Sequence, residues 1–195
     1  MLIKKAEAKD LLALTAFINA NTLDVSKITS ADYISKIENE GFLIGGVNEE
    51  YLTKYLGNIY LAFSDNNEMI GYIRIEEGHD EDFVRMTSSD EIEWIDEKFK
   101  IEYLHEPHFE LGGLLVSREF ANQGIGQQLY NVAESEAKKI NIDNIYSFVA
   151  TNPYKNKPSL HFHEKNGFKV VAKLKKTKLY GLNDYQSVLL VKSIS

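Results

Sequence analysis

Apolar residues at helical spacing dominate the first part of the chain. Leu11, Leu14 and Ile18 share one face of a predicted helix. Ser30 is a suitable N-cap and Gly41 a suitable stop for a second helix. We therefore expect a short strand and three helical segments, over residues 2–6, 8–19, 30–41 and 49–56.

The pattern then changes to the period of two that is typical of strands. Two β-rich runs, over residues 58–64 and 69–75, are separated by Asp65-Asn66-Asn67-Glu68, which predicts a hairpin. Residues 145–150 form an almost continuous apolar run, as expected of a strand buried on both faces. Two antiparallel strands, over residues 168–174 and 185–191, are expected to close the chain.

The centre of the chain combines a strand with a helix. Residues 108–116 predict a strand broken by Gly112-Gly113, where glycines mark a bulge or a close approach of the backbone. A loop over residues 117–123 and an amphipathic helix over residues 124–140 follow. This order is that of a βαβ unit with parallel outer strands. The predicted class is α/β, with a mixed, mostly antiparallel sheet, a central parallel strand pair and helices on both faces.

Residues 78–106 form an unusually acidic segment. Its ten acids and three bases give 3 − 10 = −7, which equals the net charge of the whole chain. Ser88-Ser89-Asp90-Glu91 has the form of a capping box and precedes Ile92, Ile95 and Phe99 at helical spacing, so we expect a helix here. Either a solvated surface helix or an acidic lid that favours a cationic partner fits this composition.

Composition narrows the class of protein further. The 195 residues include 22 Lys and Arg against 29 Asp and Glu, and 44 % are apolar. A net acid is poorly suited to grip nucleic acid, and no apolar run approaches the ~18 residues of a membrane span. The absence of cysteine excludes disulfides and thiolate metal sites. We expect a single cytoplasmic domain over residues 1–195.

A Gly-x-Gly turn is the first candidate binding element. Gly124 and Gly126 lie between the end of a predicted strand and the start of an amphipathic helix. The free N–H groups of a first helical turn favour an anion such as phosphate. A tight turn that merely starts a helix explains the same glycines. The full dinucleotide-binding and P-loop patterns are absent.

A polar row is the second candidate element. Asn156, Ser159 and His163 are spaced three and four apart, so they fall along one side of a predicted helix over residues 157–165. The row either lines a ligand or consists of an N-cap followed by two ordinary surface residues.

Together these two motifs resemble the GNAT superfamily of acyl-CoA-dependent N-acyltransferases. The family has Arg/Gln-x-x-Gly-x-Gly/Ala at a helix start, and later Asn-x-x-Ser/Ala and an aromatic-Tyr-Glu-Lys-x-Gly-Phe run. This chain has Ala121-Asn122-Gln123-Gly124-Ile125-Gly126, then Asn156-Lys157-Pro158-Ser159 and Phe162-His163-Glu164-Lys165-Asn166-Gly167-Phe168. The predicted order of elements fits over residues 1–195, with residues 78–106 as an insertion.

The resemblance implies acetyl transfer from acetyl-CoA, as co-substrate and without a metal, to a primary amine. The helix start would bind the pyrophosphate, and a splayed strand pair would hold the pantetheine arm. Residues implied in binding the co-substrate are Leu114, Leu115, Val116, Ala121, Asn122, Gln123, Gly124, Ile125, Gly126, Gln127, Asn156, Ser159, Phe162 and His163.

Two positions depart from the family pattern. Ala121 replaces the usual Arg or Gln, which leaves backbone N–H groups, or Arg118, to contact the pyrophosphate. His163 replaces the tyrosine that protonates the departing thiolate. Glu110 occupies a position where the family often has a carboxylate general base, and a glutamate in a surface ladder is the alternative.

Other candidate residues carry weaker signals. Trp94 and Tyr103 fit either the wall of an acceptor pocket or the core. Residues Glu102, His105, Glu106 and His108 match no standard metal-ligand spacing.

The partner implied by the resemblance is a small-molecule or peptide amine, with a cationic acceptor favoured by the acidic segment. Neither nucleic acid nor a membrane is expected, and a homodimer stays open. The alternative functions are a catalytically silent acyl-CoA-binding module and an interaction protein that uses its acidic segment.

Overall fold

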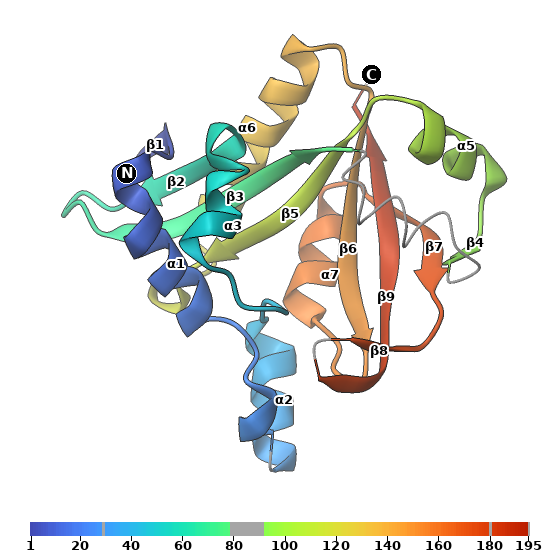
Figure 1. Cartoon of the computed structure of the whole chain (residues 1–195), viewed down its shortest axis with the longest axis horizontal. Coiled ribbons are helices and arrows are strands. Elements are labelled where there is room, and N and C mark those ends of the chain that lie inside the picture. Colours follow the sequence, from blue (N-terminus) through green and yellow to red (C-terminus); the bar gives the residue numbers. More distant parts are fainter. Residues whose placement is uncertain (29, 79–91, 180, 195) are drawn as a thin grey trace. The chain divides into compact units, whose positions relative to one another are not determined.

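The computed structural model describes residues 1–28, 30–78, 92–179 and 181–194. It is a mixed α/β structure of mostly antiparallel strands with one parallel pair among the described strands, β5 (Phe109–Val116) with β6 (Asn144–Asn152), and with helices around them (Figure 1). The predicted fold class is therefore confirmed. The chain forms two compact units, which are described separately.

The first unit comprises Met1–Thr22, Leu43–Glu76 and Leu111–Asn141. Its strands follow the order β1-β2-β3-β5, and the β2–β3 hairpin is antiparallel, as predicted. Besides the end of β5, its elements are β1 (Leu2–Lys5), α1 (Leu11–Ala20), α3 (Glu49–Thr53), β2 (Ile59–Phe63), β3 (Met69–Glu77) and α6 (Ile125–Lys139), with short 3-10 turns at Ala8–Asp10, Leu56–Asn58 and Arg118–Phe120.

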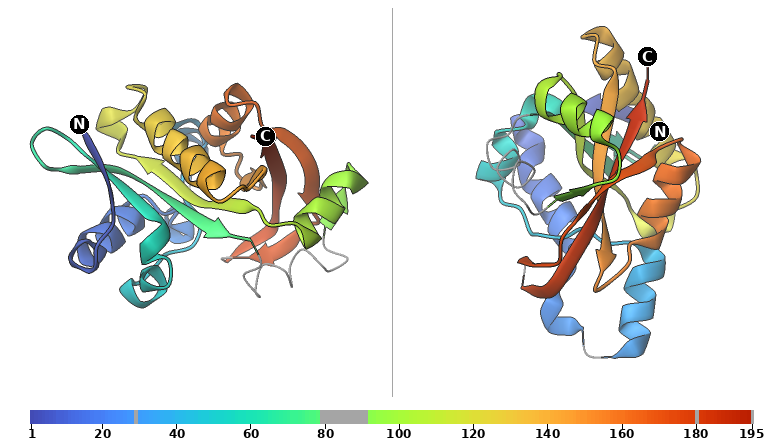
Figure 2. Two further views of the ribbon diagram at one scale, coloured as in Figure 1. Left: turned by 90° about the horizontal axis from the view of Figure 1, so that it is seen from above. Right: turned by 90° about the vertical axis from the view of Figure 1, so that its right-hand side faces the viewer.

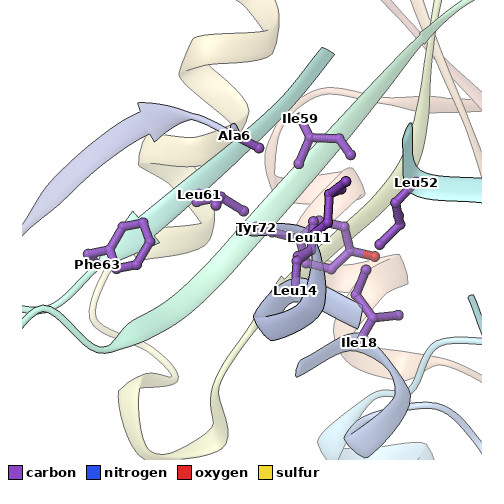
Figure 3. Close-up of a cluster of buried hydrophobic side chains, with 9 residues drawn as sticks. All are labelled: Ala6, Leu11, Leu14, Ile18, Leu52, Ile59, Leu61, Phe63 and Tyr72. Carbon is purple, nitrogen blue, oxygen red and sulfur yellow. The ribbon is translucent and has the colours of Figure 1, made fainter. Parts of the chain in front are cut away.

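Helices cover both faces of these strands (Figure 2). On one face, apolar side chains of α1 and α3 pack against alternate residues of β2 (Figure 3). The cluster consists of Ala6, Leu11, Leu14, Ile18, Leu52, Ile59, Leu61, Phe63 and Tyr72. On the face toward α6, Gly71 of β3 allows close packing because it has no side chain. A Cβ there would lie 3.2 Å from Leu129 and 2.9 Å from the carbonyl oxygen of Leu115.

The second unit comprises Leu23–Phe42, Glu77–Glu110 and Ile142–Ser195. Its strands follow the order β5-β6-β9-β7-β4, with β8 paired to β9. Besides β6 and the start of β5, its elements are α2 (Ala31–Glu40), β4 (Ile92–Trp94), α5 (Glu97–His105), α7 (Lys157–Lys165), β7 (Lys169–Leu174), β8 (Thr177–Leu179) and β9 (Leu182–Ser193), with a 3-10 turn at Val25–Lys27.

Local sequence signals set the two predicted helices of this unit. The Ser30 side chain accepts a hydrogen bond from the amide of Tyr33 at the start of α2, and Gly41 caps its end with a φ of 83°. The Asn156 side chain accepts from the amide of Ser159 at the start of α7. These N-caps satisfy backbone donors that a helix start leaves unpaired.

The prediction of a helix that begins near residue 88 and includes Ile92 is wrong. Ser88-Ser89-Asp90-Glu91 lies outside the described residues, and Ile92–Trp94 forms a strand that pairs with β7. The helix α5 begins only after Asp96, whose side chain accepts from the amide of Lys98. The alternation Ile-Glu-Trp suits an edge strand, and pairing with a distant segment outweighs the local helical spacing.

Strand β5 also differs from expectation, because it runs continuously through Gly112-Gly113. The predicted close approach is confirmed in the first unit. Arg74 Nη2 donates to the carbonyl oxygen of Gly112 at 2.8 Å and lies 2.7 Å from Glu76 Oε1. A Cβ at residue 112 would collide with the Glu76 carboxylate and lie 2.5 Å from Arg74 Nε. The missing side chain therefore gives space to a buried ion pair.

We predict that Gly112→Ala lowers the free energy of unfolding by ~1–3 kcal/mol, the usual cost of overpacking. The physical reason is that the new methyl group displaces Glu76 from Arg74. Gly57→Ala is the matched control, since a Cβ at Gly57 meets nothing within 4 Å. Urea unfolding of both variants measures the difference, and equal stability would show that the ion pair adapts without cost.

Candidate functional site

The loop between β5 and α6, in the first unit, presents backbone donors. Gly124 is the N-cap residue of α6 in a left-handed conformation, with a φ of 80°. Gln128 donates the first hydrogen bond of the helix, to the carbonyl of Gly124 at 3.1 Å. The N–H groups of residues 125–127 therefore precede the helical ladder, where they and the helix dipole favour an anion.

The conformation of the preceding loop supports this arrangement. Ser117 donates its N–H to the carbonyl of Ile70 at 2.8 Å, which ties the loop to β3. Asn122 has a φ of 61°, and the segment 121–124 is exposed. The exposed side chain of Ala121 is a methyl group and supplies no polar contact.

The other predicted residues of this unit lie where β5 ends. Leu114, Leu115 and Val116 are half-buried. Leu115 also packs against the apolar cluster of α1, α3 and β2. In the first turn of α6, Ile125 is buried, whereas Gly126 and Gln127 are half-buried.

The predicted polar row on α7, in the second unit, is assembled as expected. The amide of Asn156 accepts from the N–H of Ser159 at 3.3 Å and donates through Nδ2 to the carbonyl of Phe42 at 2.8 Å. Its Oδ1 atom thus caps the start of α7, and its Nδ2 atom joins α7 to the residue that follows Gly41. Ser159 Oγ lies 3.4 Å from His163 Nδ1, so all three side chains of the row lie in sequence along the helix.

His163 is a buried residue, which excludes the interpretation of it as a surface side chain. Its exposed fraction is 4 %, and its ring lies edge-on to Phe168 and Phe162, with centroids at 4.8 and 5.7 Å. Nδ1 lies 2.7 Å from the carbonyl oxygen of Ser159, so Nδ1 carries the proton and donates it. Within the described residues, Nε2 has no hydrogen-bond partner.

Burial also sets the charge of this imidazole. It lowers the pKa of His163 below the usual value, although the hydrogen bond to the Ser159 carbonyl acts in the opposite direction. The neutral ring therefore has a lone pair, rather than an N–H, at the buried Nε2 atom.

Glu110 is also buried, which excludes a surface ladder. Its exposed fraction is 7 %, and it lies opposite Tyr146 in the parallel pairing of β5 with β6. The hydroxyl of Tyr103 donates to Glu110 Oε1 at 2.5 Å, and His108 Nε2 lies 3.4 Å from the same oxygen. A buried carboxylate requires such partners, because desolvation of the charge is costly.

An aromatic cluster surrounds this carboxylate. The ring of Tyr103 lies 4.6 Å from His108, 4.8 Å from Tyr146 and 5.7 Å from Trp94, centroid to centroid. His108 is fixed further by Nδ1, which lies 3.0 Å from the carbonyl of Glu106. Burial and the nearby carboxylates raise the pKa of the Tyr146 hydroxyl.

Sequence reasoning missed this cluster. His108 and Glu110 are two apart in the predicted strand over residues 108–116, although β5 itself begins at Phe109, so their shared face was readable. The contact with Tyr103 of α5 was not readable. Tyr103 is 2 % exposed and packs in the core, which was one of the two roles considered for it, the other being the wall of an acceptor pocket. The part of the chain that the structure describes contains no group of three or more side chains arranged to hold a metal ion.

Comparison with a family of known proteins identifies the class of this protein, an acyl-CoA-dependent acetyltransferase. A family profile, that of the acetyltransferase (GNAT) family, matches residues 25–168, which include both motifs. The chain belongs to this family. A comparison with curated protein sequences finds no match.

Solved structures agree on the fold. A GNAT-family acetyltransferase from Streptococcus pneumoniae has a TM-score of 0.63 at 19 % identity, covering 100 % of this chain and 99 % of that chain. Naa20 of Chaetomium thermophilum in complex with a bisubstrate analogue has a TM-score of 0.63 at 17 % identity, covering 99 % and 86 %. Naa50 of Arabidopsis thaliana with the bisubstrate analogue CoA-Ac-MVNAL has the same score and identity, covering 99 % and 98 %. None of the described helices is long and apolar enough to span a membrane.

We predict that the stability of the protein depends on pH through His163. Because the folded-state pKa is lowered, the unfolded chain binds more protons as the pH falls below ~6.5, and the free energy of unfolding decreases there. His163→Phe is expected to flatten this decrease between pH 7 and pH 5, measured by urea unfolding. His161→Phe, at an exposed position of the same helix, is the control and should keep the wild-type slope. A wild-type slope in His163→Phe would contradict the assignment.

Proposed function

We propose that this protein transfers the acetyl group of acetyl-CoA to the primary amine of a small molecule or a peptide. The observation that carries the proposal is the start of α6. There the glycine-capped first turn directly follows β5 and its loop, inside the region that matches the GNAT family. Free N–H groups at a helix start are suited to a pyrophosphate.

The backbone of residues 122–127 supplies the contacts to the pyrophosphate in this proposal. Gly126 gives the phosphate room to approach, and Arg118, exposed on the 3-10 turn before the loop, adds a positive charge nearby. The N–H groups near Leu115 and Val116 polarise the thioester carbonyl. Asn156, Ser159 and Phe162 line the arm of the co-substrate from α7.

Glu110 acts as the general base. An ammonium ion must lose a proton before its nitrogen can attack a thioester, and Glu110 takes that proton directly or through water. The Tyr103 hydroxyl donates to Oε1, and His108 Nε2 lies 3.4 Å from the same oxygen. Oε2 is therefore the oxygen to which we assign the proton.

His163 serves the leaving thiolate, but in a different way from a tyrosine. A tyrosine has a proton to give at neutral pH, because its usual pKa is ~10. The N–H of neutral His163 is already donated to Ser159, so Nε2 must take up a proton before it can pass one to sulfur. We propose that Nε2 accepts the second proton that the amine nitrogen releases as it is acylated, and passes this proton to the departing thiolate.

The acceptor is a primary amine, and the acidic composition of residues 78–106 favours one that carries further positive charge. The analogue bound to Naa50 joins CoA to the sequence MVNAL, which supports including peptides among the amines tested.

We expect Gly126→Val to abolish binding of acetyl-CoA while the fold survives. The branched side chain would stand where the pyrophosphate approaches the first turn of α6. Isothermal titration calorimetry with acetyl-CoA measures the affinity, and circular dichroism checks the fold. Gln128→Val is the control, because it places the same side chain at an exposed position beyond that turn. Unchanged affinity in Gly126→Val would refute the assignment of the pyrophosphate site.

Turnover on a panel of primary amines, including polyamines, lysine and peptides, tests the reaction itself. Glu110→Gln and His163→Phe should each lower kcat by ~10²-fold or more, the usual size of a general acid–base contribution, with little change in the affinity for acetyl-CoA. His163→Tyr should retain much of the activity. Glu164→Gln, an exposed carboxylate beside His163, is the control and should behave as wild type. Binding of acetyl-CoA without acetylation of any amine would favour a silent acyl-CoA-binding module.

A further inference from the structure

Tyr103 comes from the acidic segment that the resemblance treated as an insertion, yet its hydroxyl reaches the proposed base. It lies on α5 and is 2 % exposed, and its oxygen is 2.5 Å from Glu110 Oε1. The hydroxyl is placed to donate to this carboxylate oxygen. A segment outside the family motifs thus contacts the residue that the reaction depends on.

The ring of Tyr103 cannot turn away easily, because aromatic neighbours pack around it. Trp94 of β4, His108 and Tyr146 of β6 lie within 5.7 Å of it, centroid to centroid. Rotation of a ring in such a cluster would need its neighbours to move. The direction of the hydroxyl is therefore fixed by packing before any substrate arrives.

We propose that Tyr103 is a positioning residue for Glu110, an inference that rests on the proposed role of Glu110 as the base. The hydroxyl donates to Oε1 and holds the plane of the carboxylate. The acceptor's ammonium then gives its proton to Oε2, directly or through water, and the Glu110 carboxylate becomes neutral. The O–H bond of Tyr103 is not broken, so Tyr103 acts through Glu110.

Tyr146 provides a matched control in the same cluster. Its ring lies 4.8 Å from that of Tyr103, and it is also fully buried. Within the described residues, its hydroxyl has no hydrogen-bond partner. Tyr103→Phe and Tyr146→Phe therefore make the same chemical change among the same rings, but only the first removes a donor from Glu110.

The experiment compares wild type, Tyr103→Phe, Tyr146→Phe, Glu110→Gln and the double variant Tyr103→Phe/Glu110→Gln. Each is assayed with acetyl-CoA and the amine of the panel that wild type acetylates fastest. Tyr103→Phe should lower kcat by ~10-fold or more, the effect of losing one hydrogen bond to a charged group, and leave KM for acetyl-CoA within ~2-fold. Tyr146→Phe should keep wild-type kcat. The double variant should be no slower than Glu110→Gln alone.

The outcomes separate the two claims. Wild-type kcat in Tyr103→Phe, with Glu110→Gln impaired, overturns the positioning role and leaves the base in place. Wild-type kcat in Glu110→Gln, or no acetylation of any amine by wild type, overturns the role of Glu110 and the positioning role with it. An equal loss in both phenylalanine variants, or losses that multiply in the double variant, shows an effect of packing and overturns the proposal.

Discussion

A buried carboxylate must be hydrogen-bonded, and this requirement at Glu110 accounts for much of the second unit. Glu110 is 7 % exposed at the start of β5, so its charge has little access to water. Tyr103 supplies the close donor, and for that α5 must lie against the start of the parallel strand pair. Tyr146 completes the apolar wall from β6. The pairing of β4 with β7 holds the chain that leads into α5. Strand β4 and helix α5 together thus place the Tyr103 donor beside the Glu110 carboxylate.

In the first unit, a buried cation likewise requires partners. Arg74 is 9 % exposed, and its Nη2 atom lies 2.7 Å from Glu76 Oε1. The rings of Tyr51 and Tyr55 lie 5.0 and 4.8 Å from the guanidinium carbon, where their faces attract a cation. Gly112 accepts one hydrogen bond and has no side chain in the way. Removing the Glu76 carboxylate would leave the buried Arg74 charge without its ion-pair partner, which costs far more than an exposed ion pair contributes.

The sequence predicted those parts of the structure that depend on local signals. The bounds of α2 follow from Ser30 and Gly41, because cap residues act within one turn. The strand at Ile92–Trp94 did not follow, because its partner β7 is far along the chain and no local pattern encodes that pairing. The contact of Tyr103 with Glu110 was not predictable for the same reason, because no local pattern encodes it. It joins a helix to a strand across a proline-containing turn, and only the packing of three rings sets the distance. Roles in binding and catalysis came from the family resemblance rather than from periodicity.

His163 shows how a single substitution in a motif constrains the chemistry through its surroundings. A tyrosine side chain has one polar group, the hydroxyl at the end of its ring, and this group can donate a proton. An imidazole has two, and in this helix the first is committed to the carbonyl of Ser159, four residues earlier. That bond fixes the tautomer, and burial disfavours the imidazolium, so Nε2 is left as a base. Glu110 is buried to a similar degree, and its carboxylate accepts a hydrogen bond from the Tyr103 hydroxyl. The two candidate catalytic groups therefore both stand ready to accept a proton, and the proton that reaches the leaving sulfur must come from the reaction itself.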